Sequence, residues 1–527
     1  MRDFHRPGRS AVYARNGICA TSHPVAGNVA IDVLRRGGNA VDAAVAAAIT
    51  LGICEPQMTG IGGDCFIMIK PAGSERIIGL NGSGRSPGAL TADHLRSQGL
   101  TAVPLTSAHA VTVPGAMAAF ERVVTDHGKL GFAEALAPAI MYAEQGVPVA
   151  PRVAADWAAA ADSLQGEARR HYLLNDAAPR VGDVFRAPGQ AAALKLAQKD
   201  GARVFYEGEV AQDMVDSLRA LGGLHTMDDF AACRPDYVEP VTGRYRDVEI
   251  VEMPPNGHGV TALLLARLLE HFEIGRLDPF GPMRVHLETE AIKLAYDARN
   301  RFVADPDHMP QGLAPMMDEA KIEGLIRLID PQRAIPDARR ATAAVHKDTV
   351  YLTVVDRDRM AVSLIYSIFH AFGSGLASTK FGINFQNRGA GFTLEKGRPN
   401  ELGPNKRPLH TIIPAMMRRD GKVAMSFGVM GGQYQPTGHV RLVSNMVDFG
   451  MDVQAAIDAP RSFFEDGALT LERGYDEAVI APLESRGHAV RRRAEPLGGA
   501  QAIIIDEARG VLIGASDPRK DGAAQAW

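Results

Sequence analysis

The sequence pattern of this chain changes at Thr349. Residues from about 115 to 330 read mostly as amphipathic helices, whereas strand-like patterns dominate from Thr349 onward. A helix buries one stripe and a sheet one face, so each needs a partner layer. This order therefore predicts helical layers that cover sheets to which both segments contribute, with the loop at 330–348 as the boundary.

Apolar periodicity, caps and turn residues place the individual elements. We expect helices at 40–51, 115–126, 132–145, 190–198, 210–221, 260–271, 282–302, 437–447 and 453–458. We expect strands at 65–69, 350–356, 360–366, 409–416, 423–427, 502–506 and 511–513, with a hairpin turn at 356–358.

The composition excludes several classes of protein. The formal net charge of −4 over 527 residues, with 22% charged residues, leaves no basic stripe for nucleic acid. The four cysteines form no CxxC pair, and the histidines have no metal-ligand spacing. The apolar run at 40–54 contains Asp42 and is too short to span a bilayer. We expect no metal or other cofactor, no nucleic-acid or membrane partner, and a cytoplasmic location.

Two short motifs are better explained as turns. Gly84-Arg85-Ser86-Pro87-Gly88 matches the G-x-S-x-G pattern of serine hydrolases, but that motif needs a backbone N–H after the serine, and Pro87 has none. Gly60-Ile61-Gly62-Gly63 lacks the third glycine of a dinucleotide fingerprint.

Thr349 gains a base for its own hydroxyl only if the peptide bond before it is cut. A new amino-terminal threonine has an α-amine with a pKa of roughly 7.7–8, which can take the proton of its own hydroxyl. Downstream, Gly431 and Gly432 can offer two N–H groups to a reacting carbonyl, as an oxyanion hole requires. Ser367 would reach the threonine if the strands at 350–356 and 360–366 pair.

Several motifs, in order from near residue 18 to near residue 519, together resemble the γ-glutamyltransferase family. They are Thr21-Ser22-His23-Pro24, Gly37-Gly38-Asn39-Ala40-Val41-Asp42, Glu55-Pro56, Gly60-Ile61-Gly62-Gly63, Asp348-Thr349, Phe372-Gly373-Ser374-Gly375, Gly403-Pro404-Asn405-Lys406-Arg407-Pro408, Gly431-Gly432 and Ala515-Ser516-Asp517-Pro518-Arg519. The resemblance implies an N-terminal-nucleophile hydrolase with an α+β fold, a four-layer αββα sandwich. It also implies self-cleavage between Asp348 and Thr349 into a large subunit, 1–348, and a small subunit, 349–527. The two would stay together as one compact heterodimer that could pair further.

The resemblance also implies roles for single residues. Thr349 would be the nucleophile and, through its α-amine, the base. Ser367 stands where the family usually has a threonine that hydrogen-bonds the nucleophile. Gly431 and Gly432 match the oxyanion glycines. The acyl-enzyme would be released by water or by an acceptor amine.

Departures from the family pattern bear on the substrate. At positions that hold the α-amine and α-carboxylate of a γ-glutamyl group, this chain has Phe369, Arg388, Gly391, His410 with Thr411, and Ser83. The aspartate that would pair with a substrate ammonium is missing, and Arg388 would repel that ammonium. Arg388 and Arg85 suit a carboxylate, with His410 and Thr411 beside it. The alternative for Arg388 is a bond to a main-chain carbonyl or to an acidic neighbour.

We therefore expect hydrolysis of a small, carboxylate-bearing amide. The segment from Phe392 to Gly403 is short for a lid, and an open pocket favours water over an amine acceptor. The motifs around Gln386 and Thr349 are closest to the amidohydrolase branch, with oxamate amidohydrolases, glutathione hydrolases and cephalosporin-acylase-like proteins. The acyl group is left open between γ-glutamyl, oxamyl and glutaryl. The alternative is a processing-deficient binding or scaffold relative without turnover.

Overall fold

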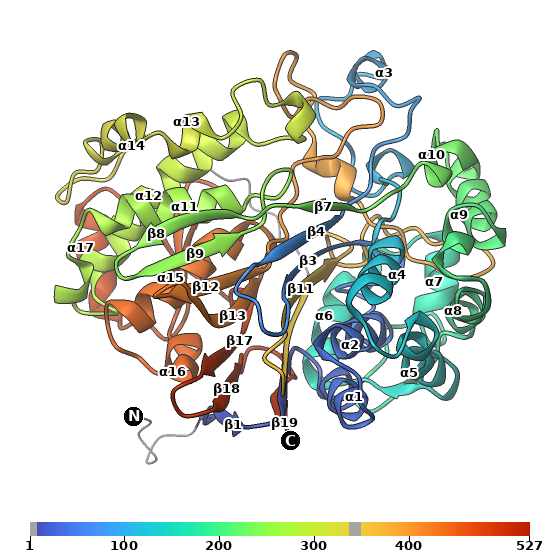
Figure 1. The fold of residues 1–527 in the computed structure, drawn as a ribbon. Coiled ribbons are helices and arrows are strands. Elements are labelled where there is room, and N and C mark those ends of the chain that lie inside the picture. The colour runs from blue at the N-terminus through green and yellow to red at the C-terminus, as the bar shows by residue number, and fades with distance from the viewer. Residues whose placement is uncertain (1–7, 337–348) are drawn as a thin grey trace.

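Two sheets of seven strands lie face to face at the centre of the structure (Figure 1). The structure is a computed structural model that describes residues 8–336 and 349–527. Sheet A has the order β1 (Val12–Ala14), β18 (Val511–Ser516), β17 (Gly499–Asp506), β13 (Lys422–Met430), β12 (Ala415–Arg419), β9 (Val248–Glu252) and β8 (Val241–Tyr245). Sheet B has the order β19 (Ala524–Ala526), β2 (Gly17–Thr21), β10 (Val350–Asp356), β11 (Ala361–Ser367), β3 (Asp64–Lys70), β4 (Ile78–Gly82) and β7 (Asp236–Val238).

Helices cover the outer face of each sheet, so the molecule has four layers (Figure 1). Helices α1 (Pro24–Arg35), α2 (Ala40–Cys54) and α4 (Ala116–His127) contact sheet B, and α5 (Phe132–Gln145) and α8 (Pro188–Asp200) pack behind them. On the other side, α11 (Gly259–Glu270) and α15 (Gln435–Val447) contact sheet A, with α12 (Pro282–Phe302) against α11. The remaining helices are α3 (Ala92–Ser97), α6 (Pro151–Ala160), α7 (Gly166–Tyr172), α9 (Glu209–Ala220), α10 (Met227–Ala231), α13 (Ala314–Met317), α14 (Glu319–Ile326), α16 (Val453–Asp458) and α17 (Ile480–Ser485).

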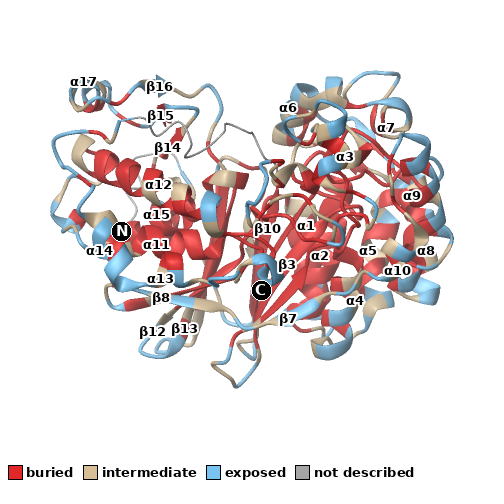
Figure 2. Ribbon diagram, turned by 90° about the horizontal axis from the view of Figure 1, so that it is seen from above, coloured by how far each residue is buried: buried red, intermediate tan, exposed pale blue. Residues whose placement is uncertain are grey.

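Three apolar clusters hold these layers together. Figure 2 shows that buried residues fill the interior of the molecule and that exposed residues lie around its rim. One cluster joins sheet B to its helices and a second joins sheet A to its helices. The third lies between the two sheets, where Phe66, Tyr351 and Ile365 of sheet B meet Val251 and Ile503 of sheet A. The expected αββα sandwich is therefore confirmed.

Both sides of residue 349 contribute strands to both sheets. Strands β10, β11 and β19 enter sheet B beside β2 and β3, and β12, β13, β17 and β18 enter sheet A beside β1 and β9. All strand pairs in these two sheets are antiparallel. Residues 1–348 and 349–527 thus share one fold, although the cut between them stays a prediction.

Most of the expected elements are present, and four have the expected bounds: α5, α12, α16 and β10. The strand expected at 409–416 is largely wrong, because β12 begins only at Ala415. Before it, the His410 N–H donates to the Asn256 carbonyl at 2.8 Å, and the Ile413 N–H donates to the Gln435 side chain at 2.9 Å. These bonds satisfy the backbone without a neighbouring strand.

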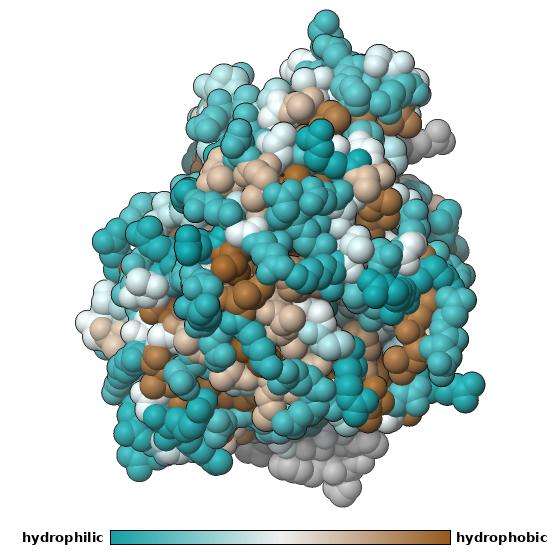
Figure 3. Space-filling model, turned by 90° about the vertical axis from the view of Figure 1, so that its right-hand side faces the viewer, coloured by the Kyte–Doolittle hydropathy of each residue, from teal (hydrophilic) through white to brown (hydrophobic). Residues whose placement is uncertain are grey.

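Smaller elements complete the structure. The short sheets are β5 (Val147–Pro148) with β6 (Val184–Phe185), and β14 (Ser462–Glu465) with β15 (Ala468–Leu471) and β16 (Val490–Arg492). Among the described residues, no helix is long and apolar enough to cross a membrane. The face seen in Figure 3 is mainly hydrophilic, with apolar side chains in small separate patches.

Candidate active site

Thr349 lies directly before β10, at the edge of the described chain, and only 2% of its surface is exposed. Strands β10 and β11 pair with Val350 opposite Tyr366, so the next pair of positions brings Thr349 to Ser367. Thr349 Oγ1 hydrogen-bonds Ser367 Oγ at 3.3 Å. The antiparallel register thus joins the two hydroxyls that the sequence indicated. Asp348 lies outside the described residues.

Ser367 is fixed in turn by a backbone amide and a guanidinium. Its Oγ accepts hydrogen bonds from the Phe369 N–H at 2.8 Å and from Arg388 Nη2 at 3.1 Å. Phe369 has a φ of 84°, a value that is uncommon for a residue other than glycine and that turns its N–H back toward Ser367. The serine is therefore held in one orientation beside the threonine.

Arg388 lies behind this pair of hydroxyls, fully buried. Its Nη1 donates to Thr411 Oγ1 at 3.0 Å, and its guanidinium stacks over the Phe369 ring at 4.1 Å. Burial lowers the pKa of Arg388 to about 9, with partial compensation by Asp64, so the side chain stays charged at neutral pH. The sequence left Arg388 open between the substrate and another group of the chain, and in the structure its terminal nitrogens are bound to Ser367 and Thr411.

Asp64, a residue that the sequence analysis did not single out, joins several segments of the site through its carboxylate. Its Oδ1 accepts from the N–H groups of Gly84 and Gly115 at 3.1 and 3.0 Å and from Gln386 Nε2 at 2.9 Å. Its Oδ2 lies 3.2 Å from His410 Nε2. The only signal in the sequence was its place directly after the glycine-rich turn at 60–63.

His410 is entirely buried in this network and packs against the Phe66 ring. Burial and then the Arg388 charge lower the pKa of His410 to about 3, so the imidazole is neutral at physiological pH. The expected contact of His410 with the substrate gains no support from this geometry. Its position is that of a residue that orients Asp64.

A cavity of about 800 Å³ opens next to these residues. Phe369 and Thr411, which both contact Arg388, form part of its wall. The short segment from Phe392 to Gly403 forms another part. The full lining is Asp297, Arg299, Asn300, Arg301, Phe369, Ala390, Gly391, Thr393, Glu395, Arg398, Asn400, Leu409, Thr411 and Gln433. Thr411 therefore lines a space that can hold a small molecule, and its contact with the substrate stays a prediction.

Gly431 and Gly432 form the turn between β13 and α15, immediately before the cavity residue Gln433. Their φ values of 121° and 55° lie in the region that favours glycine. Within the described chain, neither N–H donates to a backbone carbonyl outside the regular elements. Their oxyanion role remains a prediction that this geometry allows.

Arg85 lies in a different place from the one expected. Its Nη1 donates to Asp305 Oδ2 and to the Asn405 carbonyl, both at 3.0 Å. It lines a separate cavity of about 180 Å³, together with Ser83 and Arg407. The placement of Arg85 beside Arg388 in one carboxylate site is therefore wrong, because a long-range ion pair holds its guanidinium elsewhere.

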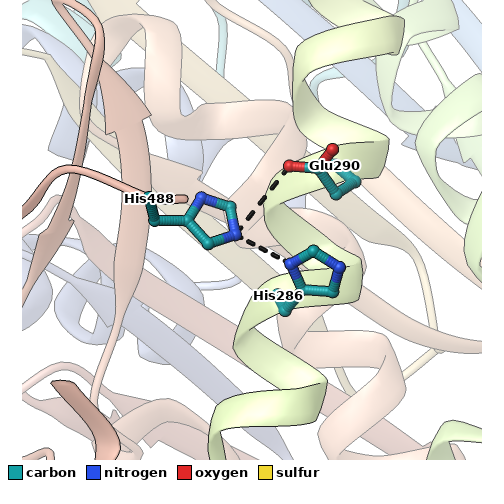
Figure 4. A group of neighbouring side chains, drawn as sticks. All are labelled: His286, Glu290 and His488. Atoms are coloured by element: carbon teal, nitrogen blue, oxygen red, sulfur yellow. Dashed lines mark hydrogen bonds and ion pairs between the residues drawn. The ribbon is translucent and has the colours of Figure 1, made fainter. Parts of the chain in front are cut away.

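The spacing of histidines along the sequence did not reveal one cluster of side chains that could bind a metal ion (Figure 4). Atoms of His286, Glu290 and His488 lie within 4.8 Å of one another, close enough to hold a metal ion. However, Lys293 Nζ already donates to Glu290 Oε1 at 2.7 Å, and His286 bonds His488 at 2.8 Å. The cluster joins α12 to the segment after α17, so it links the two sides of residue 349 as a buried polar contact.

The αββα sandwich with a threonine at the start of a central strand defines an N-terminal-nucleophile hydrolase fold. The Gamma-glutamyltranspeptidase family model matches residues 26–527, and the chain belongs to this family. It is 34% identical to the glutathione hydrolase-like YwrD proenzyme of Bacillus subtilis (98% of this chain, 99% of the relative). It is 32% identical to the oxamate amidohydrolase proenzyme of Klebsiella pneumoniae (98% and 100%). The structure of a cephalosporin acylase from Bacillus halodurans superimposes with a TM-score of 0.93 at 36% identity (100% and 99%).

The Ser367 hydroxyl gives a first prediction. Ser367→Thr keeps the hydroxyl, so we expect processing within a few-fold of the wild-type rate. Ser367→Ala removes the hydrogen-bond partner of Thr349 Oγ1 and of the Arg388 guanidinium. We expect the processing rate to fall by roughly tenfold to a hundredfold. The measurement is the rate at which the two fragments form on a denaturing gel. Equal rates for the alanine and threonine variants would contradict a role for this hydroxyl.

Proposed function

We propose that this chain cuts itself before Thr349 and then hydrolyses a small amide whose acyl part bears a carboxylate. The observation that carries the proposal is the contact between Thr349 Oγ1 and Ser367 Oγ, at the start of a central strand and beside a cavity. The relatives named as a glutathione hydrolase-like protein, an oxamate amidohydrolase and an acylase support amide hydrolysis.

Self-cleavage begins with attack of Thr349 Oγ1 on the carbonyl carbon of Asp348. The C–N bond breaks, the acyl group moves to the oxygen, and the nitrogen takes a proton to become the new α-amine. Water then hydrolyses the ester, which leaves a carboxylate on Asp348 and a free hydroxyl on Thr349. Ser367 supports this step by orienting Oγ1.

Turnover uses the same oxygen with a better base. The free α-amine takes the hydroxyl proton while Oγ1 attacks the amide carbon of the substrate. The resulting oxyanion is stabilised by the Gly431 and Gly432 N–H groups. The amine product leaves with the proton from the α-amine, and water, activated by the same amine, hydrolyses the ester to release the acid.

The identity of the acyl group is tested by comparing glutathione, oxamate and a glutaryl anilide on the processed protein. We expect no strong preference for an acyl group with an α-amine, because Arg388 adds a buried positive charge at this site and the usual aspartate is replaced by Gly391. We also expect that added glycylglycine will not accelerate turnover. Efficient transfer of a γ-glutamyl group to glycylglycine would overturn the proposal.

A further inference from the structure

Buried arginines in the described chain fall into two groups. Four of them form an ion pair with a carboxylate, namely Arg284, Arg407, Arg441 and Arg461. The other two, Arg299 and Arg388, have no carboxylate within ion-pair distance among the described residues. A buried charge without a counter-ion costs several kcal/mol. Both exceptions therefore need an explanation.

Arg299 projects from the last turn of α12 and is only 3% exposed. It donates to neutral oxygens: Nε and Nη2 contact Asn300 Oδ1 at 3.0 and 2.7 Å, and Nη1 contacts Gln433 Oε1. Its guanidinium also stacks on the Tyr296 ring at 4.6 Å. Burial lowers the pKa of Arg299 to about 10, so it remains a cation at neutral pH. These contacts fix its orientation without neutralising it.

The two exceptional arginines belong to the same cavity. Arg299 lines the space of about 800 Å³ directly, and Arg388 lies behind the Phe369 and Thr411 side chains that line it. The other charged lining residues neutralise each other, because Arg301 pairs with Asp297, and Arg398 pairs with Glu395 at 2.9 Å. The cavity near the nucleophile thus carries the unpaired positive charge of Arg299 in its lining, and Arg388 lies behind that lining.

We infer that Arg299 binds the carboxylate of the substrate. The inference rests on the proposed amide hydrolysis and adds which residue recognises the charge. A guanidinium that is buried, held in place and without a counter-ion matches a planar carboxylate with charge-assisted hydrogen bonds. Arg388 does not line the cavity and its terminal nitrogens hold Thr411 and Ser367, so it is left to act on the nucleophile.

The carboxylate could belong to the acyl part or to the amine part of the amide, and three matched substrates separate these sources. They are glutaryl-p-nitroanilide, its neutral methyl ester, and 4-(butyrylamino)benzoate. In Arg299→Met we expect kcat/KM to fall at least tenfold for one of the two charged substrates, mainly through KM. A fall for the glutaryl compound places the carboxylate on the acyl part, and a fall for the benzoate places it on the amine part. The charged substrate should lose far more than the methyl ester.

Arg122→Met is the control, because it removes the positive charge of an exposed arginine that pairs with Asp126 and does not line this cavity. It should leave the preference for charged over neutral substrates within about twofold. Arg299→Lys keeps the positive charge but loses the two parallel N–H donors of the guanidinium. It should therefore restore part of the preference for charged over neutral substrates. Equal losses for charged and neutral substrates in Arg299→Met, or none, would overturn the inference.

Direct binding separates this inference from the proposed function. Calorimetry on the wild-type protein needs no turnover, and it compares glutarate with butyrate for the acyl part and 4-aminobenzoate with aniline for the amine part. We expect the member with the additional carboxylate to bind at least tenfold more tightly in one of the two pairs. Arg299→Met should remove that difference, and Arg299→Lys should reduce it if the methionine variant does not fold. A protein that turns over amides but shows no such difference in either pair refutes only the Arg299 site. A protein that shows the difference but neither processing nor turnover refutes only the enzyme.

Discussion

Thr349→Ala is expected to remain a single full-length chain and to hydrolyse no amide. The variant loses the oxygen that attacks Asp348 and, later, the substrate, and no other hydroxyl can replace it at the start of β10. Wild-type protein should instead give two fragments of about two-thirds and one-third of the chain length. Amino-terminal sequencing of the smaller fragment should read Thr-Val-Tyr-Leu-Thr. Denaturing electrophoresis and an amidase assay on the same preparation measure both effects.

Thr349→Ser is the matched control for this result, because it keeps the hydroxyl and removes only a methyl group. It should still be cleaved, at a reduced rate, and should retain measurable turnover. If the alanine variant were cleaved at the same place, a contaminating protease would be responsible. If the wild-type protein remained whole and inactive, the chain would be a scaffold relative and not an enzyme.

The parts of this site that depend on local order could be predicted from the sequence. Strand patterns on either side of a short turn at Asp356 fix an antiparallel register, and this register brings Thr349 to Ser367. The turn itself forms as expected, with Asp356 Oδ1 accepting from the Asp358 N–H at 2.9 Å. The change from helical to strand patterns at Thr349 indicated helices that cover shared sheets, and the resemblance of the motifs to the γ-glutamyltransferase family implied the four-layer fold.

Contacts between residues far apart in the sequence explain which site residues were placed wrongly or missed. The sequence grouped Arg85 with Arg388, but Arg85 pairs with Asp305, 220 residues away. Arg299 lies inside a correctly predicted helix, yet periodicity does not show which buried face meets a cavity. Asp64 collects donors from three separate segments, so no local pattern could reveal its role.

The second large effect concerns the pH dependence of catalysis in Arg388→Gln. Arg388 Nη2 donates to the same Ser367 oxygen that contacts Thr349, so its charge lies one hydrogen-bonded residue away from the nucleophile. A nearby cation lowers the pKa of an amine, which makes the Thr349 α-amine a free base at lower pH. Without this charge, the pKa of the amine should rise. We expect the acid limb of kcat/KM to move upward by roughly one pH unit.

The same substitution should lower kcat near pH 7 by roughly a hundredfold, as for the loss of one preorganised charged donor. His410 does not obscure the measurement, because burial keeps its pKa at about 3, far below the acid limb. The control is Arg122→Gln, which changes an exposed arginine that pairs with Asp126 on α4, and it should leave the pH profile unchanged.

Two other roles of Arg388 predict different results. If Arg388 bound the substrate carboxylate instead, KM for charged substrates would rise and the acid limb of kcat/KM would not shift. If it only supported the fold, the rate would fall at every pH alike. An upward shift of the acid limb separates activation of the nucleophile from both alternatives.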